Sequence, residues 1–155
     1  MRDLSAVFKG LLNSRPVEQR TPIQITRLWY HEVMRVFTDR LISEVEVTRC
    51  RDVIVNVGKR FMQDDDPDVV FADPCSFTNF VNNSGGINDE LTNYKVCEDF
   101  NKLKTVLEQK LMEYNETKTI MNLVLFEQAV RHVTRITRII SFPGGNALLV
   151  GVGGS

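Results

Sequence analysis

The chain has 155 residues, of which 43% are hydrophobic and 25% are charged, and its 19 basic and 20 acidic side chains give a formal charge of -1. This is the composition of a globular protein. It lacks the surplus of Lys and Arg that binding to nucleic acid or to an anionic membrane surface requires, so we expect neither nucleic acid nor a membrane among its partners.

The cysteines Cys50, Cys75 and Cys97 are widely spaced and form no C-x-x-C pair. Their number and spacing favour neither a disulfide framework nor a zinc site, and we predict no metal ligands. The amino terminus carries too many charges for a secretion signal, and no apolar run approaches the ~20 residues that cross a bilayer. We therefore expect a cytoplasmic protein.

Helical periodicity dominates the first part of the chain, where apolar residues recur every three or four positions. The ranges with this spacing are 4–12, 22–41 and 44–61. Thr21 and Gln24 fit a capping box, with Pro22 at the first helical position, where its missing N–H costs nothing. Ser43 and Glu46 repeat the capping-box pattern. We predict three helices here.

The second predicted helix carries the side chains that invite a functional interpretation. Trp29 and Phe37 lie on its apolar stripe, and we predict that both belong to the core. His31 is followed by Glu32, but a zinc-peptidase helix needs a second His four positions after the first, where this chain has Arg35. We therefore predict that His31 is a surface or half-buried residue without a ligand role.

Regular periodicity stops between residues 64 and 92, where proline and glycine accumulate. We predict an irregular connection here, with one short strand over residues 69–72. Asp73 after that strand resembles the start of an acidic pair that positions magnesium and water in NTPases. Pro74 occupies the place where the catalytic Glu would stand, and neither a Ser-His-Asp nor a Cys-His arrangement can be argued. We predict no catalytic residue.

Helical order returns over residues 96–114 and 123–140. Arg131, Arg135 and Arg138 line one face near the end of the last helix, where positive charge complements the helix dipole. A solvated face or a contact with an acidic surface explains such a stripe better than a phosphate site does.

Residues 147–150 form an uninterrupted apolar run, Ala-Leu-Leu-Val, which is typical of a strand buried on both faces of a parallel sheet. No other segment offers an obvious sheet for it to join. We therefore expect its partner strands to lie beyond the end of this chain, and we predict that the strand is poorly protected without them.

The last five residues continue this run with Gly151, Val152, Gly153, Gly154 and Ser155. They match the first positions of the phosphate-binding loop G-x-x-x-x-G-K-[ST], in which glycines let backbone N–H groups turn toward phosphate oxygens. The Lys and the magnesium-binding hydroxyl of that loop would follow Ser155. A flexible Gly/Ser tail fits the same residues.

Two stretches resemble the AAA+ region of dynein heavy chains, with wording closest to the axonemal ones. The first comprises Arg2–Leu4, Phe8–Leu12, Leu28–Glu32, Arg35–Phe37 and Asp39–Leu41. The second comprises Leu123–Phe126, Ala129, His132, Arg135–Ile136, Arg138 and Pro143–Ser155. The resemblance covers nearly the whole chain and is least distinctive between residues 63 and 92.

The resemblance implies a mainly α fold: a helical AAA+ lid bundle, followed by the opening helices and first strand of an α/β P-loop AAA+ domain. Residues 1–62 would be the lid of the third AAA+ module, residues 63–92 an irregular connection, and residues 93–155 the start of the fourth module, ending inside its Walker A loop. Gly151–Ser155 would then be a partial nucleotide site. Arg2 would occupy the sensor-2 position, where a guanidinium meets the terminal phosphate of the third module's nucleotide.

The family implies a part of an ATP-driven, minus-end-directed microtubule motor in the cytoskeleton of a cilium or flagellum, which passes nucleotide-dependent changes between neighbouring AAA+ modules. Its cofactors would be ATP or ADP with Mg, bound by the parent protein and not by this segment. Its other partners would be dynein intermediate and light chains and microtubules, through other parts of the parent. We expect no hydrolysis by this chain itself, because phosphoryl transfer depends on positioned charges that it lacks. The alternative is a stand-alone helical interaction module with a flexible tail.

Overall fold

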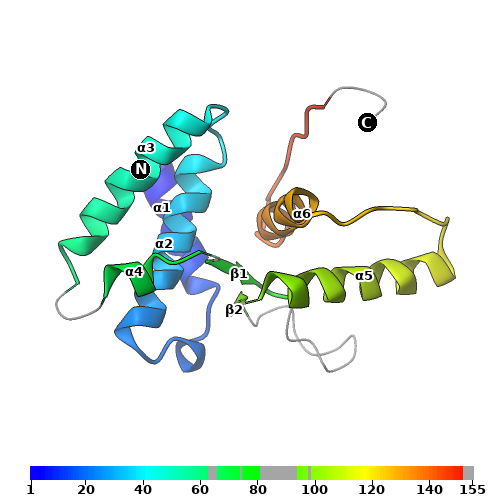
Figure 1. Cartoon of the computed structure of the whole chain (residues 1–155), viewed down its shortest axis with the longest axis horizontal. Coiled ribbons are helices and arrows are strands. Elements are labelled where there is room, and N and C mark those ends of the chain that lie inside the picture. The colour runs from blue at the N-terminus through cyan, green and yellow to red at the C-terminus, as the bar shows by residue number, and fades with distance from the viewer. Residues whose placement is uncertain (63–65, 74, 81–93, 98, 152–155) are drawn as a thin grey trace. The chain divides into compact units, whose positions relative to one another are not determined.

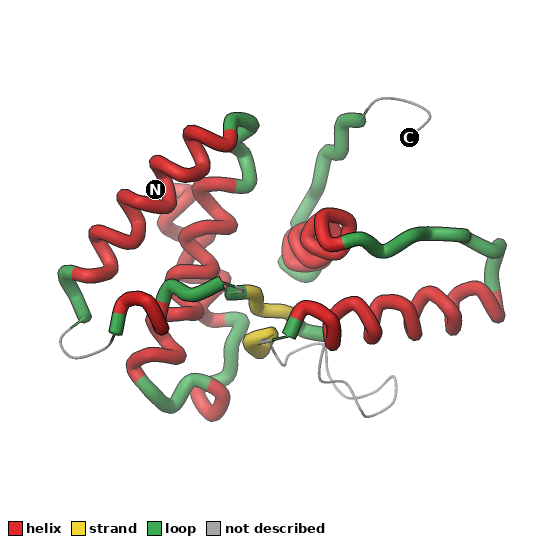
Figure 2. Tube along the Cα trace, in the orientation of Figure 1, coloured by secondary structure: helices red, strands yellow, loops and turns green. Residues whose placement is uncertain are grey.

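The computed structural model describes residues 1–62, 66–73, 75–80, 94–97 and 99–151. The chain divides into two compact units, Met1–Phe100 and Asn101–Ser155. The described residues are mostly helical, as the tube in Figure 2 shows, and this confirms the predicted mainly α fold class.

The first unit is a helical bundle with a small hairpin. It contains α1 (Arg2–Leu12), the 3-10 helix η1 (Pro16–Glu18), α2 (Pro22–Thr38), α3 (Glu44–Lys59), α4 (Pro67–Val70), β1 (Ser76–Thr78) and β2 (Lys95–Cys97). Helix α2 is central and packs against both α1 and α3 (Figure 1). The strands pair antiparallel, with Phe77 opposite Val96.

The start of α2 is fixed locally, as the sequence predicts. The Thr21 hydroxyl accepts from the Gln24 backbone N–H at 3.3 Å, and the Gln24 side chain accepts from the Thr21 N–H at 3.1 Å. The capping box therefore satisfies two donors at the helix end. Ser43 is the N-cap of α3, but its side chain makes no capping hydrogen bond, so the second predicted box does not form.

Two neighbouring apolar clusters hold the bundle together. The larger consists of Val7, Tyr30, Val33, Ile54, Val70 and Phe71, and the smaller of Leu28, Phe77 and Tyr94. The rings of Tyr30 and Phe71 meet edge to face at 5.1 Å, an arrangement that aromatic pairs prefer. Phe37 is 38% exposed and belongs to neither cluster, so its predicted core position is wrong, whereas Trp29 packs at the edge of the larger one.

The strand predicted over residues 69–72 is wrong, because this segment begins as the short helix α4. Asp66 caps the helix by accepting from the Asp68 N–H at 2.9 Å, and Pro67 stands in its first turn. At the other end, the Arg27 guanidinium of α2 donates to the carbonyls of Val69 at 2.7 Å and Val70 at 3.2 Å. A side chain more than forty positions away thus satisfies carbonyls that a helix end leaves open.

The second unit contains most of α5 (Phe100–Thr117) and α6 (Glu127–Ile140). Both helices begin about four residues later than predicted: Val96 pairs in β2, and residues 123–126 precede α6 without helical structure. Asn115 organises the turn between them, since its amide donates to the Met121 carbonyl at 3.0 Å and its oxygen accepts from the Met121 N–H at 2.8 Å. After α6, Gly144 adopts a positive φ of 71° in a tight turn.

The strand predicted over residues 147–150 is not formed in this structure. The segment carries no strand pairing, and Leu148 and Val150 are 92% and 89% exposed. A strand requires a neighbour that accepts and donates its backbone hydrogen bonds, and the described residues of this unit supply none.

Candidate functional site

The predicted phosphate loop is only partly described by the structure. Gly151 is exposed, and a Cβ added there would meet no atom within 4 Å. Val152, Gly153, Gly154 and Ser155 lie outside the described residues. A phosphate cradle needs converging N–H groups at the end of a supported strand, and the described residues around Gly151 do not form one.

Arg2, the sensor-2 candidate, is the first residue of α1 and is exposed. It lines a shallow surface hollow together with Met1, Ser5, Ala6 and Lys9, beside the start of the helix. No acidic side chain lines this hollow, so an anion could approach Arg2 and Lys9 from solvent. Arg2 belongs to the first unit and Gly151 to the second.

The most distinctive polar feature of the structure was missed by the sequence analysis. Glu32 of α2 has 0% exposure, and its Oε1 accepts a 2.6 Å hydrogen bond from the Tyr94 hydroxyl. The Tyr94 Oη also lies 3.0 Å from His31 Nε2, and His31 Nδ1 lies 3.1 Å from the carbonyl oxygen of Cys75. We call His31, Glu32 and Tyr94 the buried triad.

Burial of the triad corrects the prediction for His31, which is only 5% exposed and not a surface or half-buried residue. Its ring packs 5.4 Å from that of Phe77 in β1 and 6.1 Å from that of Tyr94. A signal was present in the sequence: Leu28, His31 and Glu32 have the spacing of residues that share one helix face. Since Leu28 is apolar, this face could have been assigned to the core.

Gly10 of α1 makes room for the Glu32 side chain. A Cβ at this position would overlap the Glu32 carboxylate and would lie 2.8 Å from its Cγ. Glycine is unfavourable in a helix interior, so its presence in α1 is explained by this close approach. Sequence reasoning could have used Gly10 as an indication that something passes close to α1.

The triad joins segments that are distant in the sequence. Tyr94 immediately precedes β2, the Cys75 carbonyl precedes β1, and both are held on α2. Ser14, just after α1, donates to the Tyr94 carbonyl at 3.3 Å. The hairpin that leads into α5 is therefore fastened to the bundle by buried hydrogen bonds. Such bonds are costly to break, since they leave buried polar groups without partners.

A second polar group fastens the chain between α4 and β1. The Arg51 guanidinium of α3 contacts the Asp73 carboxylate at 3.0 Å. Burial raises the pKa of Tyr30, against the opposing charge of Arg51. Burial by itself would lower the pKa of Arg51, but Tyr30 and Asp73 raise it overall. Burial also raises the pKa of the Cys75 thiol to about 11, which keeps it protonated and unreactive at neutral pH.

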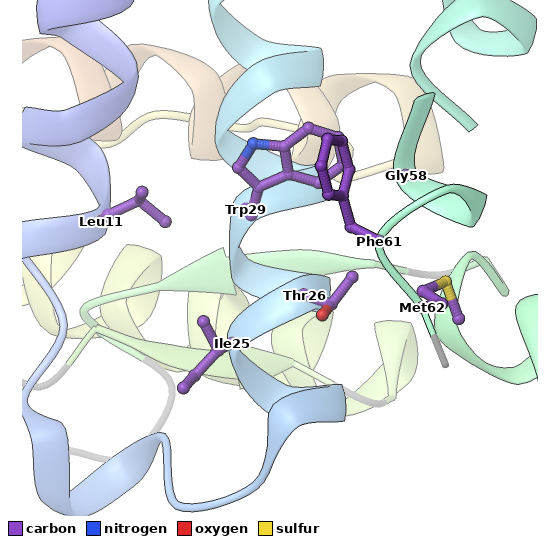
Figure 3. A pocket seen from close by; sticks show the side chains of 7 residues that line it. All are labelled: Leu11, Ile25, Thr26, Trp29, Gly58, Phe61 and Met62. Carbon is purple, nitrogen blue, oxygen red and sulfur yellow. The ribbon is translucent and has the colours of Figure 1, made fainter. Parts of the chain in front are cut away.

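An apolar pocket of about 310 Å³ opens between the first three helices. Its lining residues, shown in Figure 3, are Leu11, Ile25, Thr26, Trp29, Gly58, Phe61 and Met62. None of these side chains ionises, so the pocket can accommodate an apolar group but offers no acid, base or charge for catalysis. Gly58 lets α3 pack closely beside this pocket, because a Cβ there would lie 2.7 Å from Cζ of Phe71 and 3.2 Å from Cζ3 of Trp29.

The arginine face of α6 is partly engaged within its own unit. Arg131 donates to Glu127 at 2.8 Å, and the Arg138 guanidinium lies 5.2 Å from the centre of the Phe142 ring.

Among the described residues, no three His, Cys, Asp or Glu side chains are grouped so that they could hold a metal ion. None of the helices that the structure describes is long and apolar enough to cross a membrane.

Two family models match separate parts of the chain. The AAA+ lid domain matches residues 1–72, and the P-loop containing dynein motor region D4 matches residues 121–155. The first match covers the bundle of the first unit through α4 and contains Arg2, His31 and Glu32. The second covers α6 and the glycines at the end of the chain.

Curated relatives match over the full chain. The chain is 43% identical over 155 residues to human "Dynein axonemal heavy chain 17" and 42% identical to "Dynein beta chain, ciliary" of Tripneustes gratilla. It is 40% identical over 162 aligned residues to "Dynein beta chain, flagellar outer arm" of Chlamydomonas reinhardtii. Each alignment covers 100% of this chain and 3% of the relative, so the chain spans a small part of the length of these proteins.

Proposed function

We propose, because this chain belongs to the dynein heavy chain family, that it is the part of an ATP-driven, minus-end-directed microtubule motor subunit that joins two consecutive AAA+ modules. Residues 1–62 form the lid of the third module, residues 63–92 the connection, and residues 93–155 the beginning of the fourth. Its role is to pass nucleotide-dependent changes of conformation from one module to the next.

The order of the two family matches is the observation that carries this proposal. A lid match is followed, in one short chain, by a match to the motor region named D4. Names of the relatives refer to cilia, flagella and axonemes, which supports a place in the axonemal cytoskeleton. Neighbouring AAA+ modules are the direct partners, and dynein intermediate and light chains and microtubules engage other parts of the parent. A stand-alone interaction module explains neither the order of the two family matches nor the similarity to dynein heavy chains over all 155 residues of this chain.

The parent protein would bind ATP or ADP with Mg and act as an ATPase. In this chain Gly151–Ser155 would contribute backbone N–H groups to the phosphates, and Arg2 would contribute a guanidinium to the nucleotide of the preceding module. The described residues do not build either nucleotide site by themselves. We therefore expect the 155-residue chain to show no ATP turnover above a protein-free blank, and robust turnover would contradict the proposal.

Transmission between the modules requires a firm joint, and the buried triad supports one. Tyr94 stands six residues before α5 and is bonded to α2 through Glu32. A movement of the lid would therefore pull on the segment that leads into the next module. Coupling between sites needs such a packed, hydrogen-bonded element whose arrangement both sites can bias.

The test uses a complete motor that carries this sequence. Tyr94→Phe removes the hydroxyl, and we expect the stimulation of ATPase activity by microtubules to fall by about fivefold or more, the lower range of measured coupling energies. Lys95→Ala is the matched control, because Lys95 follows Tyr94 directly and the change breaks only the partly exposed 2.9 Å ion pair between Lys95 of β2 and Glu18 of η1. We expect that control to change stimulation by less than about twofold. A folded Tyr94→Phe motor with full stimulation would show that coupling does not pass through this joint.

A further inference from the structure

We propose that Ser43 is a phosphorylation site for a protein kinase that recognises acidic residues, and that the phosphate caps the start of α3. The site lies in the loop between α2 and α3 and does not depend on the proposed role in the motor. Three features identify it: the loop is exposed, carboxylates follow Ser43, and the fold leaves the Ser43 hydroxyl without a role.

Ser43 lies where an enzyme can reach it. It is exposed, and the preceding Ile42 and the nearby Val45 are 99% and 60% exposed. Its backbone is extended, with a φ of -82° and a ψ of 126°. Exposed loops are the segments that modifying enzymes reach most readily, because little packed structure has to open for binding.

The hydroxyl of Ser43 is not used by the fold. The sequence predicts a capping box for Ser43 and Glu46, but the Ser43 side chain makes no capping hydrogen bond. By contrast, the Thr21 hydroxyl, at the same position before α2, accepts from the Gln24 N–H at 3.3 Å. The first turn of α3 therefore lacks the stabilisation that a cap gives, and it can open together with the loop when an enzyme binds.

The charges next to Ser43 favour a kinase that reads acidic residues. Glu44 and Glu46 stand one and three positions after Ser43, both are exposed, and neither forms an ion pair with a described residue. Arg40 stands three positions before Ser43, where a kinase that reads basic residues would bind a guanidinium. This guanidinium is already engaged, because its Nη2 contacts the Asp3 carboxylate at 3.0 Å. The two carboxylates are therefore the charges that the loop offers to a partner.

The sequence contains one other Ser or Thr with an acidic residue three positions later. Thr105 precedes Glu108 with this spacing. It lies inside α5, where its hydroxyl donates to the Asn101 carbonyl at 2.9 Å, and Glu108 contacts Lys104 at 3.7 Å. The sequence pattern does not distinguish the two sites, whereas the structure engages the groups at Thr105 and leaves those at Ser43 open.

The chemical step needs ATP as the co-reactant and a kinase that binds Glu46 through basic side chains. Ser43 Oγ attacks the γ-phosphorus of ATP, the bond between that phosphorus and the bridging oxygen breaks, and ADP leaves with the electron pair of that bond. The hydroxyl proton passes to a carboxylate of the kinase. The products are a phosphoserine at position 43 and ADP.

The phosphate supplies the acceptors that the start of α3 lacks. The first N–H groups of a helix have no carbonyl partner within the helix, and the Ser43 side chain does not cap those of α3. A phosphate adds acceptor oxygens and a charge of about -1.5 to -2, which is favourable at a helix N-terminus. Repulsion from Glu44 and Glu46 opposes this effect, so the net stabilisation of the first turn is small.

Incubation of the 155-residue chain with casein kinase 2 and ATP tests the site, with peptide mass spectrometry as the readout. We expect one phosphate, on Ser43, and incorporation that is about tenfold slower in Glu46→Gln, which removes one charged contact. Thr105→Ser is the matched control, because both sites then carry the same side chain, and Ser43 should react at least about tenfold faster than the site inside α5. Equal rates at the two sites, no phosphate on Ser43, or an undiminished rate in Glu46→Gln would overturn the proposal.

Two further measurements test the kind of kinase and the effect of the phosphate. The cAMP-dependent protein kinase, which reads basic residues before its target, should modify Ser43 more slowly than casein kinase 2, and a faster reaction would overturn the acidic recognition. Hydrogen exchange at Val45 and Glu46, measured relative to the same amides in an unfolded phosphorylated peptide, should slow by about threefold after phosphorylation, as a modest cap requires. Unchanged or faster exchange would overturn the capping of α3.

Discussion

Replacement of Gly10 by alanine tests whether the close packing of α1 on Glu32 determines the stability of the lid. In an exposed helix interior this change stabilises a protein by about 1 kcal/mol, because alanine is the better helix former. Here the added Cβ would overlap the carboxylate of Glu32, which has 0% exposure and cannot move into solvent without breaking its bond to Tyr94. We therefore expect the opposite sign.

The size of the effect can be worked out from the contacts. Overpacking a buried site costs about 1–3 kcal/mol, and leaving a buried polar group without its hydrogen-bond partner costs about 1–3 kcal/mol. The gain in helix propensity offsets about 1 kcal/mol of this. The free energy of unfolding of the first unit should therefore fall by about 1–5 kcal/mol if both costs apply, and by at most about 2 kcal/mol if α1 shifts outward and the Tyr94 bond survives.

Urea unfolding monitored by tryptophan fluorescence is a suitable assay, because Trp29 is the single tryptophan and lies in α2 of the first unit. A Gly10→Ala variant that is as stable as the parent chain, or more stable, would refute the packing argument. A double-mutant cycle with Glu32→Ala supplies the control. Once the Glu32 side chain is removed, the same Gly10→Ala change should become neutral or stabilising, and an unchanged cost would place the clash elsewhere.

Three other perturbations have expected outcomes. Tyr94→Phe should lower the free energy of unfolding by about 1–3 kcal/mol, because the buried Glu32 carboxyl group loses a hydrogen-bond partner. A change of less than about 0.5 kcal/mol in urea unfolding, which is typical of a surface substitution, would contradict this. Gly58→Ala places a Cβ 2.7 Å from Cζ of Phe71 and should cost about 1–3 kcal/mol in the same assay, whereas a stabilised variant would show that the ring gives way freely. Since burial raises the pKa of Cys75 to about 11, its alkylation at pH 8, followed by mass spectrometry, should be roughly 100-fold slower than in urea, and equal rates would refute its burial. Unfolded thiols ionise nearer pH 8.5, so this group should also make stability fall as the pH rises from about 9 to 11.

The elements predicted well from the sequence are those whose signals are local. The start of α2 depends on Thr21, Pro22 and Gln24, which are contiguous or nearly so, and the structure confirms their roles. By contrast, α4 depends on Arg27, which reaches its terminal carbonyls from α2. The sequence pattern of a segment does not show such a contact with a distant residue. The valines of this segment therefore favoured a strand.

The hydrogen bonds of the buried triad could not be predicted from the sequence for a related reason. Adjacent His and Glu residues on a helix usually face solvent, and the bond to Tyr94 helps to make the burial of Glu32 tolerable. Tyr94 is separated from Glu32 by 62 positions, and the strands β1 and β2 that bring it close are three residues each. The spacing of Leu28, His31 and Glu32 indicated a shared helix face, and Gly10 indicated a close approach to α1, but neither signal identifies Tyr94 as the partner.

The difference between locally determined elements and elements that depend on distant residues is clearest at residues 147–150. The helix that precedes this apolar segment provides the comparison. Helix α6 bonds its own backbone, as in the 3.0 Å bond from Ser141 N–H to the Thr137 carbonyl, and therefore forms wherever its apolar face finds some cover. A strand has no such internal bonds, so its existence depends on a neighbouring strand. In this structure the segment leaves Leu148 and Val150 in solvent, although their side chains suit a sheet buried on both faces. If the chain acts as a joint in a heavy chain, this strand would form only when the sheet of the fourth module is present.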